Sequence, residues 1–461
     1  MSITGKILAK DKLVTDRAFY AKVLSIVLPV AAQQAINMGV NMMDTVMLGS
    51  FGEVQLSASS LANSFYQLFT ILCMGIIGGC SVLVAQFWGA KDTKRAKQTL
   101  SLAFWMAVNV GAVFAIITAL FPAAIMKLFT PDEAVIAAGV RYLRITAFIY
   151  IIHGTGLVTC HLMRAVGQAK LGLYVSIVSF FFNIFFNWMF IFGKLGAPRL
   201  EIAGAAFGTL LARMSEFVFA FYFVLKRDRN LQMRIRDYLH VPPRDLLVRY
   251  FRMGAPALVS DGLLGLGQTG TSMILGRMGA AVVAANSVCM VVDRLVTVVV
   301  QGVSNASCVT IGNTVGSGER DRAFKEGYTF YILSMVLGLI NGLIVMLVGP
   351  LTLRLYNLAP ETITLTRQMM IAYALITVFL NIQSVMTKGV LRGGGDTKFL
   401  MIADILFLWV VSIPLGYIGG IVLHAPGWLT IILLRIDYII KSIWCVSRLK
   451  SGKWIRNVNM M

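Results

Sequence analysis

Charged side chains are scarce in this chain of 461 residues: only 13% are Asp, Glu, Lys or Arg, whereas 57% are hydrophobic. Together with a mean hydropathy of +0.77, this scarcity excludes an ordinary soluble domain. The net charge of +20 does not indicate a nucleic-acid partner, because the basic residues lie between apolar stretches instead of gathering on one folded surface. We therefore expect a lipid bilayer, and no nucleic acid, as the partner.

Catalytic and metal-binding patterns are also missing. The chain has no Gly-x-Ser-x-Gly, no His-Glu-x-x-His and no paired-Asp motif on an apolar stretch, which excludes the common classes of membrane-embedded enzyme. Its six cysteines show neither Cys-x-x-Cys nor Cys/His metal spacing, so they are expected to be small core residues. We expect a protein that is not an enzyme and needs no cofactor, with no metal site beyond a possible Na+.

Long apolar stretches are what the sequence has in abundance. A helix of about 20 residues crosses the hydrocarbon core of a bilayer, and twelve such stretches can be counted. The sequence therefore predicts an all-α polytopic membrane protein with twelve transmembrane helices. The expected spans are residues 19–48, 55–87, 99–126, 134–162, 170–193, 203–226, 249–276, 281–312, 325–349, 361–390, 398–424 and 427–447.

Basic residues between the spans predict the orientation. Most of the 41 Lys and Arg residues lie on the side of the N-terminus, which makes both termini cytoplasmic in a multi-pass protein of the cell inner membrane. No small-residue cleavage site precedes the first span, so that span is expected to remain. The expected parts are a cytoplasmic N-terminus (1–18), an N-lobe (19–226), a cytoplasmic linker (227–248), a C-lobe (249–447) and a cytoplasmic C-terminus (448–461).

An internal repeat relates the two halves. Residues 29–96 align without a gap to residues 256–323, placing Pro29 on Pro256 and Gly89 on Gly316. Each half contains an even number of spans, so both enter the membrane from the same side and form a parallel repeat of two pseudo-symmetric six-helix lobes. Pro29 and Pro256 each free a backbone carbonyl inside a span, and we expect both to kink their helices.

Polar side chains inside an apolar helix are costly, so they are the first candidates for a transport pathway. In the first span they are Gln34, Asn37, Asn41 and Asp44, three or four residues apart and thus on one face of the helix. The first three are assigned to the substrate pathway.

A cation-coupling site is expected where Asp44 meets Asn183 and Asn187 of the fifth span and Thr209 of the sixth. One carboxylate, two amide oxygens and a hydroxyl are oxygen ligands suited to Na+. Alternatively, a buried Asp44 carries a proton, or the two asparagines only bond neighbouring helices. The repeat argues against the last interpretation, because the equivalent positions in the second half are mostly apolar: Thr271, Val411, Leu415 and Ile431.

The second half has its own polar set. Asp261, Gln268, Arg294 and Asn381 are assigned to the substrate pathway. The alternative is mutual ion pairing, with Arg294 neutralising Asp261 or Asp293. Local pairs are expected between neighbouring charges, and the fourth-span histidines are expected to be packing residues without a partner. These groups are Arg213 with Glu216, Arg435 with Asp437, and His153 and His161.

Three segments resemble a known family. They are Pro29 followed by Asp44-Thr-Val-Met-Leu-Gly49, the loop Ala85-Gln-Phe-Trp-Gly89-Ala-Lys-Asp92, and Arg392-Gly-Gly-Gly-Asp-Thr-Lys398. In their order, spacing and duplication they resemble the multidrug and toxic compound extrusion (MATE) family over essentially the whole chain.

The resemblance implies a monomeric antiporter that exports amphipathic, cationic small molecules in exchange for Na+ or H+ by alternating access. It also implies that Asp44, Asn183, Asn187 and Thr209 match the family's first-lobe cation site. Some relatives carry carboxylates in the second lobe where this chain has Leu264 and Asn381, so coupling is expected in the first lobe.

One rival function shares the architecture. A lipid-linked oligosaccharide or lipid flippase of the same wider superfamily would need a cationic cavity for diphosphate. The intramembrane bases available to it are Arg213, Arg294, Lys388 and Arg435. Twelve spans, where such flippases often have more, favour the exporter.

Overall fold

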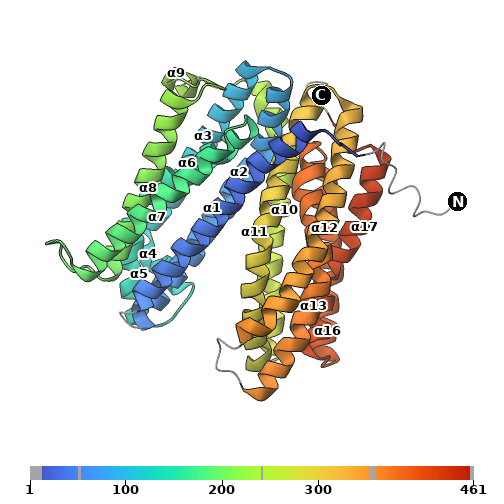
Figure 1. Cartoon of the computed structure of the whole chain (residues 1–461). Coiled ribbons are helices and arrows are strands. Elements are labelled where there is room, and N and C mark those ends of the chain that lie inside the picture. The colour runs from blue at the N-terminus through green and yellow to red at the C-terminus, as the bar shows by residue number, and fades with distance from the viewer. Residues whose placement is uncertain (1–12, 50–52, 240–241, 354–358, 457–461) are drawn as a thin grey trace. The chain divides into compact units, whose positions relative to one another are not determined.

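The structure is a computed structural model that describes residues 13–49, 53–239, 242–353 and 359–456 (Figure 1). All regular elements among these residues are helical. In the first half they are α1 (Arg17–Gly49), α2 (Glu53–Gly89), α3 (Thr93–Leu120), α4 (Pro122–Lys127), α5 (Glu133–Thr146), α6 (Ile149–Ala165), α7 (Ala169–Phe192), α8 (Ile202–Tyr222) and the π-helical turn η3 (Phe223–Arg227).

The second half repeats this pattern after the short α9 (Ile235–Leu239). Its elements are α10 (Arg244–Arg277), α11 (Ala280–Gly316), α12 (Arg320–Leu353), α13 (Pro360–Ser384), η4 (Val385–Leu391), α14 (Thr397–Asp404), η5 (Ile405–Ser412), α15 (Ile413–Tyr417), η6 (Ile418–Val422), α16 (Gly427–Leu434) and α17 (Ile436–Ser451).

Each of the twelve expected spans corresponds to a helix or to a run of adjoining helices. Within the described ranges, nine helices are long and apolar enough to cross a membrane, and the pair α5 and α6, bent by 56°, makes a tenth. The other two spans correspond to α10, whose many Gly, Ser and Thr residues lower its hydropathy, and to α16 with α17, which hold 8 and 16 residues. Pro29 and Pro256 lie inside α1 and α10, and the kink expected at each stays a prediction.

The chain divides into two compact units. One contains Pro29–Val84 and Asp92–Tyr250, and the other contains Met1–Leu28, Ala85–Lys91 and Phe251–Met461. The start of α1 and the end of α2 therefore belong to the same unit as the second half of the chain. In α1 the division falls immediately before Pro29.

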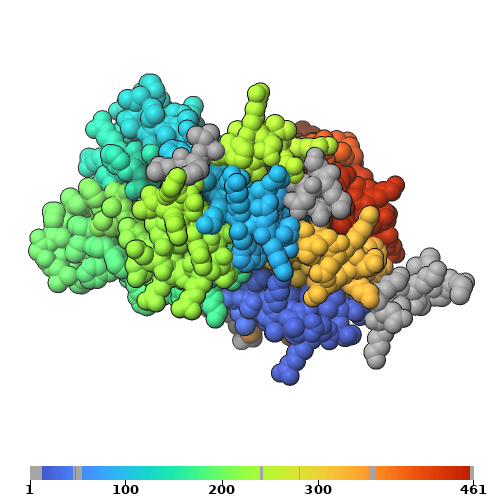
Figure 2. Space-filling model, turned by 90° about the horizontal axis from the view of Figure 1, so that it is seen from above, coloured from blue at the N-terminus to red at the C-terminus, as the bar shows by residue number. Residues whose placement is uncertain are grey.

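In the first of these units, α7 packs along α8, and α3 along α6. The connection to the second half lies against α3: Lys97 Nζ is 3.3 Å from Asp237 Oδ2, and the Trp105 indole donates to the Tyr238 carbonyl over 2.6 Å. The start of α3 and the segment around α9 lie beside each other on the face seen in Figure 2. These contacts fix α9 on its own unit.

In the other unit, α11, α12 and α13 pack against one another (Figure 1). The segment after α17 is tied back by Asp396, which is fully buried between two guanidinium groups. Its carboxylate lies 2.7 Å from Arg448 Nε and 2.9 Å from Arg456 Nη2. A buried carboxylate with two such partners is well compensated, so the loop after η4 and the end of the chain are held together.

The repeat explains two matched glycines. A Cβ atom added at Gly89 would overlap the backbone of Asn313, and one added at Gly316 would overlap the backbone of Gln86. Asn313 is the repeat equivalent of Gln86, so the two contacts are reciprocal, as in a local two-fold arrangement. Glycine is needed at both positions because the backbones of α2 and α11 approach each other too closely for a side chain.

Candidate functional site

The carboxylate of Asp44 meets the asparagine pair of α7. The amide Nδ2 of Asn187 donates to Asp44 Oδ1 over 2.6 Å and approaches Asn183 Oδ1 at 3.2 Å. Asn183 and Asn187 are one helical turn apart and are 2% and 1% exposed, because their face of α7 packs against α8. The sequence-based grouping of these three residues therefore corresponds to a contact in the structure.

The side-chain oxygen of Asn187 is an unused acceptor. It is buried and receives no hydrogen bond from the part of the chain that the structure describes. An unmatched buried acceptor costs free energy unless a donor or a cation satisfies it. It lies against Gly208 of α8, where an added Cβ would collide with it. The side-chain oxygens of Asp44, Asn183 and Asn187 thus suit a small cation or a proton. Gly208 provides the space that the Asn187 amide needs.

Thr209 lies beside the same site, on the next residue of α8. Its hydroxyl donates to the carbonyl of Ala205 over 2.9 Å and also hydrogen-bonds with the hydroxyl of Tyr142. Thr209 and Asp44 line one cavity of about 460 Å³. All four residues predicted for cation coupling therefore belong to one neighbourhood in the unit that contains α7 and α8.

This N-lobe cavity is partly aromatic and partly polar. It is lined by Asn41, Asp44, Leu56, Ser59, Ser60, Ala62, Asn63, Tyr66, Gln67, Tyr142, Thr146, Ile149, Tyr150, Thr209 and Arg213. Of the first-span pathway residues, Asn41 lies in the lining, whereas Gln34 and Asn37 lie outside it. Helical periodicity places these residues on one face, but the cavity covers only the later part of that face.

A polar network behind the cavity corrects the interpretation of His153. Tyr66 Oη is 2.5 Å from His153 Nδ1, and His153 Nε2 is 3.9 Å from Glu216. Glu216 also pairs with Arg213, at 2.6 Å, as expected from their spacing. His153 is therefore a partnered residue and does not only fill space. The sequence could not reveal this, because the tyrosine lies on α2, far from the histidine along the chain.

A second buried side-chain hydrogen bond was not predicted from the sequence. Arg164 at the end of α6 donates to Gln33 Oε1 over 2.5 Å, and Arg164 is 2% exposed. Gln33 adjoins the predicted Gln34 but lies on a different face of α1. Gly172 of α7 approaches the same amide closely, since an added Cβ would lie 3.2 Å from Gln33 Cδ. Gln33, which the sequence analysis did not single out, thus also makes a long-range contact from the first span.

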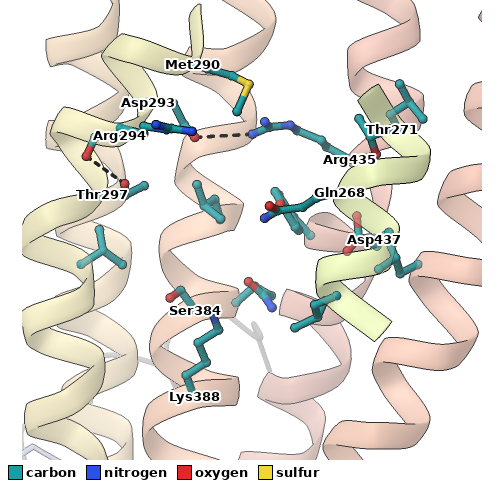
Figure 3. Close-up of a pocket in the computed structure, with 18 of the residues that line it drawn as sticks. Gln268, Thr271, Met290, Asp293, Arg294, Thr297, Ser384, Lys388, Arg435 and Asp437 are labelled. Carbon is teal, nitrogen blue, oxygen red and sulfur yellow. Dashed lines mark hydrogen bonds and ion pairs between the residues drawn. The ribbon is translucent and has the colours of Figure 1, made fainter. Parts of the chain in front are cut away.

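A cavity of about 350 Å³ occurs in the C-lobe. Figure 3 shows side chains from α11, from α10 and from the segments around η4 and α17 facing into it. Its polar lining residues are Gln268, Thr271, Ser272, Asn286, Asp293, Arg294, Thr297, Gln301, Gln383, Ser384, Lys388, Arg435, Asp437 and Tyr438. Two of the residues predicted for the second-half pathway, Gln268 and Arg294, belong to this lining.

The ion pairs of this unit differ from those expected. Asp261 pairs with Arg392, Nη2 to Oδ1 at 2.9 Å, and Asp293 pairs with Arg435 at 3.8 Å (Figure 3). The alternative in which Arg294 neutralises Asp261 is therefore wrong, and the cation that pairs with Asp293 is Arg435. Long guanidinium side chains reach across helices, so proximity in sequence does not decide the partner.

The pair expected between Arg435 and Asp437 is also replaced. Asp437 lies 3.0 Å from Lys441, which in turn lies 2.8 Å from Asp404. All three are buried, and the hydroxyls of Ser260 and Ser412 bond to Asp404 and Asp437 respectively. Lys441 is one turn from Asp437, so the helical spacing favours it.

Asn381 and Asp261 lie outside the lining of the C-lobe cavity. Asn381 is fully buried, and its Oδ1 accepts from Asn341 Nδ2 over 3.0 Å. This contact joins α12 to α13, which is the packing role that buried amides often have in membranes. The described residues contain no group of three or more His, Cys, Asp or Glu side chains that could hold a metal ion.

The sequence is similar to those of known proteins. The family model MatE matches residues 29–189 and 256–418, one match in each half of the repeat. The chain is 24% identical over 437 residues to the probable multidrug resistance protein NorM of Thermotoga maritima, covering 94% of this chain and 92% of that protein. It is 21% identical over 400 residues to the multidrug resistance protein MdtK of Yersinia pseudotuberculosis, covering 86% and 87%.

A solved structure has the same fold. The transporter VcmN of Vibrio cholerae in its bent form gives a TM-score of 0.84 at 17% identity, covering 94% of this chain and 97% of that one. The duplication, the twelve helical passes in two six-helix lobes and the family match agree with one another. The chain is therefore a multi-pass membrane protein and a member of the MATE family of transporters.

Proposed function

We propose that this protein is a secondary active exporter that extrudes amphipathic, cationic compounds in exchange for Na+ or H+, by alternating access of its two lobes. The observation that supports it most directly is the contact between Asp44 and Asn187, whose side-chain oxygen is buried against Gly208 without a hydrogen bond from the described residues. Such an arrangement favours a site that is filled and emptied during transport.

The coupling ion neutralises Asp44 in either of two ways. Na+ would be held by the Asp44 carboxylate with the oxygens of Asn187, Asn183 and Thr209. A proton on Asp44 would instead be donated to an amide oxygen after the Asn187 amide turns over, because an amide can present either its nitrogen or its oxygen. Both ways remove the same negative charge from a partly buried position.

Exchange of the compound for the ion follows if both compete for the carboxylate of Asp44. Asp44 lines the cavity together with Tyr66, Tyr142 and Tyr150, and aromatic faces attract organic cations. A cationic compound stabilises ionised Asp44, whereas Na+ or H+ cancels the charge that attracts the compound. Ligands that weaken each other's binding through one group are coupled reciprocally, which is what an antiporter requires.

The test is transport by purified protein in proteoliposomes, with a Na+ gradient or a pH gradient imposed alone. We expect one of the two gradients to drive export of a fluorescent organic cation, and the variant Asp44→Asn to lose that coupled export. The exposed carboxylate of Asp321 at the start of α12 provides a control variant, Asp321→Asn, which should transport normally. Export by Asp44→Asn at the wild-type rate would refute the assignment.

We also propose that the protein acts as a monomer in the cell inner membrane with both termini cytoplasmic. The excess of Lys and Arg on one side of the spans supports this orientation. All six native cysteines are buried, so a single cysteine introduced near either terminus can be labelled selectively. Labelling of both from the cytoplasmic side only is the expected result.

A further inference from the structure

The C-lobe cavity is richer in positive charge than its ion pairs require. Five charged side chains line it: Asp293, Arg294, Lys388, Arg435 and Asp437. Asp437 lies 3.0 Å from the buried Lys441, and Asp293 lies 3.8 Å from Arg435 (Figure 3). Each carboxylate in the lining therefore has a cation at ion-pair distance, although Asp437 shares Lys441 with the buried Asp404.

Arg294 and Lys388 remain as surplus cations. Neither forms an ion pair within the described ranges, although the charge of Arg294 also acts on its neighbour Asp293. Arg294 and Lys388 carry two positive charges, and the cluster of Asp404, Asp437 and Lys441 carries one negative charge, so the net surplus around the cavity is one positive charge. Arg294 is exposed and Lys388 is half-buried in the cavity lining. A ligand that supplies negative charge would therefore be attracted to this cavity.

The remaining lining supplies hydrogen-bond donors. Gln268, Gln301 and Gln383 all border the cavity, and each amide offers two N–H groups. Lys388 lies on η4, a π-helical turn, and such turns often occur at functional sites. The cavity therefore combines two cations that form no ion pair with any described residue and several neutral donors, which is the chemistry that recognises a carboxylate or a phosphate.

We propose that the C-lobe cavity binds the anionic group, a carboxylate or a phosphate, of an amphipathic compound through Arg294 and Lys388. This inference deepens the proposed function, since it adds acidic and zwitterionic amphiphiles to the cationic compounds expected at the N-lobe cavity. The two cavities differ because Asp44 forms no ion pair among the described residues and Arg213 of its cavity pairs with Glu216, whereas the carboxylates of the C-lobe cavity are paired with cations.

A matched pair of dyes tests the inference at equilibrium. A rhodamine free acid carries a carboxylate, and its methyl ester does not, while both share one cationic ring system. Binding is followed by fluorescence polarisation on purified protein in nanodiscs of phosphatidylcholine, with no ion gradient. We expect the wild-type protein to bind the free acid about tenfold more tightly than the ester, as one charge-assisted interaction implies.

Variants identify the residues. In Arg294→Gln and Lys388→Gln, the preference for the free acid should fall about tenfold, while ester binding stays unchanged; Lys388→Arg should keep the preference. The exposed Lys398 of α14 gives the control Lys398→Gln, which should behave as wild type. Equal binding of both dyes by the wild-type protein, or equal loss of both in the variants, would overturn the inference.

Two further arms separate related outcomes. Adding phosphatidylglycerol to the nanodiscs tests whether a lipid headgroup is the anionic ligand. If the lipid weakens free-acid binding to the wild-type protein but not to Arg294→Gln, the headgroup occupies the site. That result also supports anion binding. Gradient-driven export of the ester reports the proposed function alone. Export of the ester without any free-acid preference would reject the C-lobe site and leave the exporter assignment intact.

Discussion

The amide of Asn187 donates to the carboxylate of Asp44 over 2.6 Å, although the two residues are far apart in sequence and lie on different helices. The same amide has its oxygen buried against Gly208, where it receives no hydrogen bond from the described part of the chain. One side chain thus bridges α1, α7 and α8, so small changes on any of the three helices should affect ion coupling.

Replacing Asn187 with leucine should uncouple the transporter. Leucine is the residue at the equivalent position of the second half, Leu415, so the chain already tolerates it in this kind of helix. The change removes the donor to Asp44 and should cost roughly 1–3 kcal/mol at the carboxylate. Gradient-driven export should fall at least about tenfold, with the protein still folded by size-exclusion chromatography.

The control is Asn109→Leu, an exposed asparagine of α3 that bonds only to the carbonyl of Trp105 among the described residues. This variant should export normally. If Asn187→Leu exports at the rate of Asn109→Leu, the α7 amide has no part in coupling.

Gly208→Ala should impair coupling while every proposed ligand stays in place. A Cβ atom at Gly208 would meet the side-chain oxygen of Asn187 and lie 2.9 Å from its backbone nitrogen. Overpacking of this kind costs about 1–3 kcal/mol and displaces the neighbouring side chain. Export should therefore depend on a steeper ion gradient than in wild type.

A matched helical glycine shows whether the effect is local. Gly262 of α10 has open space where its Cβ would be, so Gly262→Ala should leave both stability and the ion dependence unchanged or slightly raise stability. Identical ion dependence in Gly208→Ala and wild type would show that the close approach has no functional role.

Lys441→Met should destabilise the C-lobe strongly. Lys441 is fully buried between Asp404 and Asp437, at 2.8 and 3.0 Å. Removing the lysine that lies between two buried carboxylates costs about 3–5 kcal/mol, because both lose their ion-pair partner. Thermal unfolding followed by tryptophan fluorescence should show a clearly lower Tm.

Adding Asp404→Asn and Asp437→Asn to this variant should recover most of the loss, since neutral amides need no counter-charge. The control Lys450→Met changes an exposed lysine of α17 and should leave the Tm unchanged. A Tm of the triple variant as low as that of Lys441→Met would mean that packing, not charge, explains the effect.

Helical periodicity and the internal repeat predict much of the site. Asp44 shares a helix face with Asn41, and Asn183 with Asn187, because residues three or four apart face the same way. Asn183 and Asn187 are replaced by Val411 and Leu415 in the second half, which favours a coupling role over generic packing. The same reasoning could not find Gly208, because a glycine that accommodates a neighbour leaves no polar signal in the sequence.

The partners of the buried ion pairs could not be predicted from the sequence. Asp261 could have met Arg294 or another base, and only the packing of α10 against the segment around η4 selects Arg392. Likewise, the pairing of Gln33 with Arg164 depends on the approach of α1 to α6. Periodicity gives the face of a helix on which a charge lies, but not the helix that this face meets.

The sequence by itself determined that this chain is a membrane protein of two repeated six-helix halves, because apolar length and the spacing of polar residues are local properties read directly along the chain. The tertiary structure decided which charges pair with one another, and so which basic residues line the C-lobe cavity without an ion pair to any described residue: Arg294 and Lys388. Electrostatic balance depends on distances between helices, and those distances are set only when the side chains of all the helices pack together.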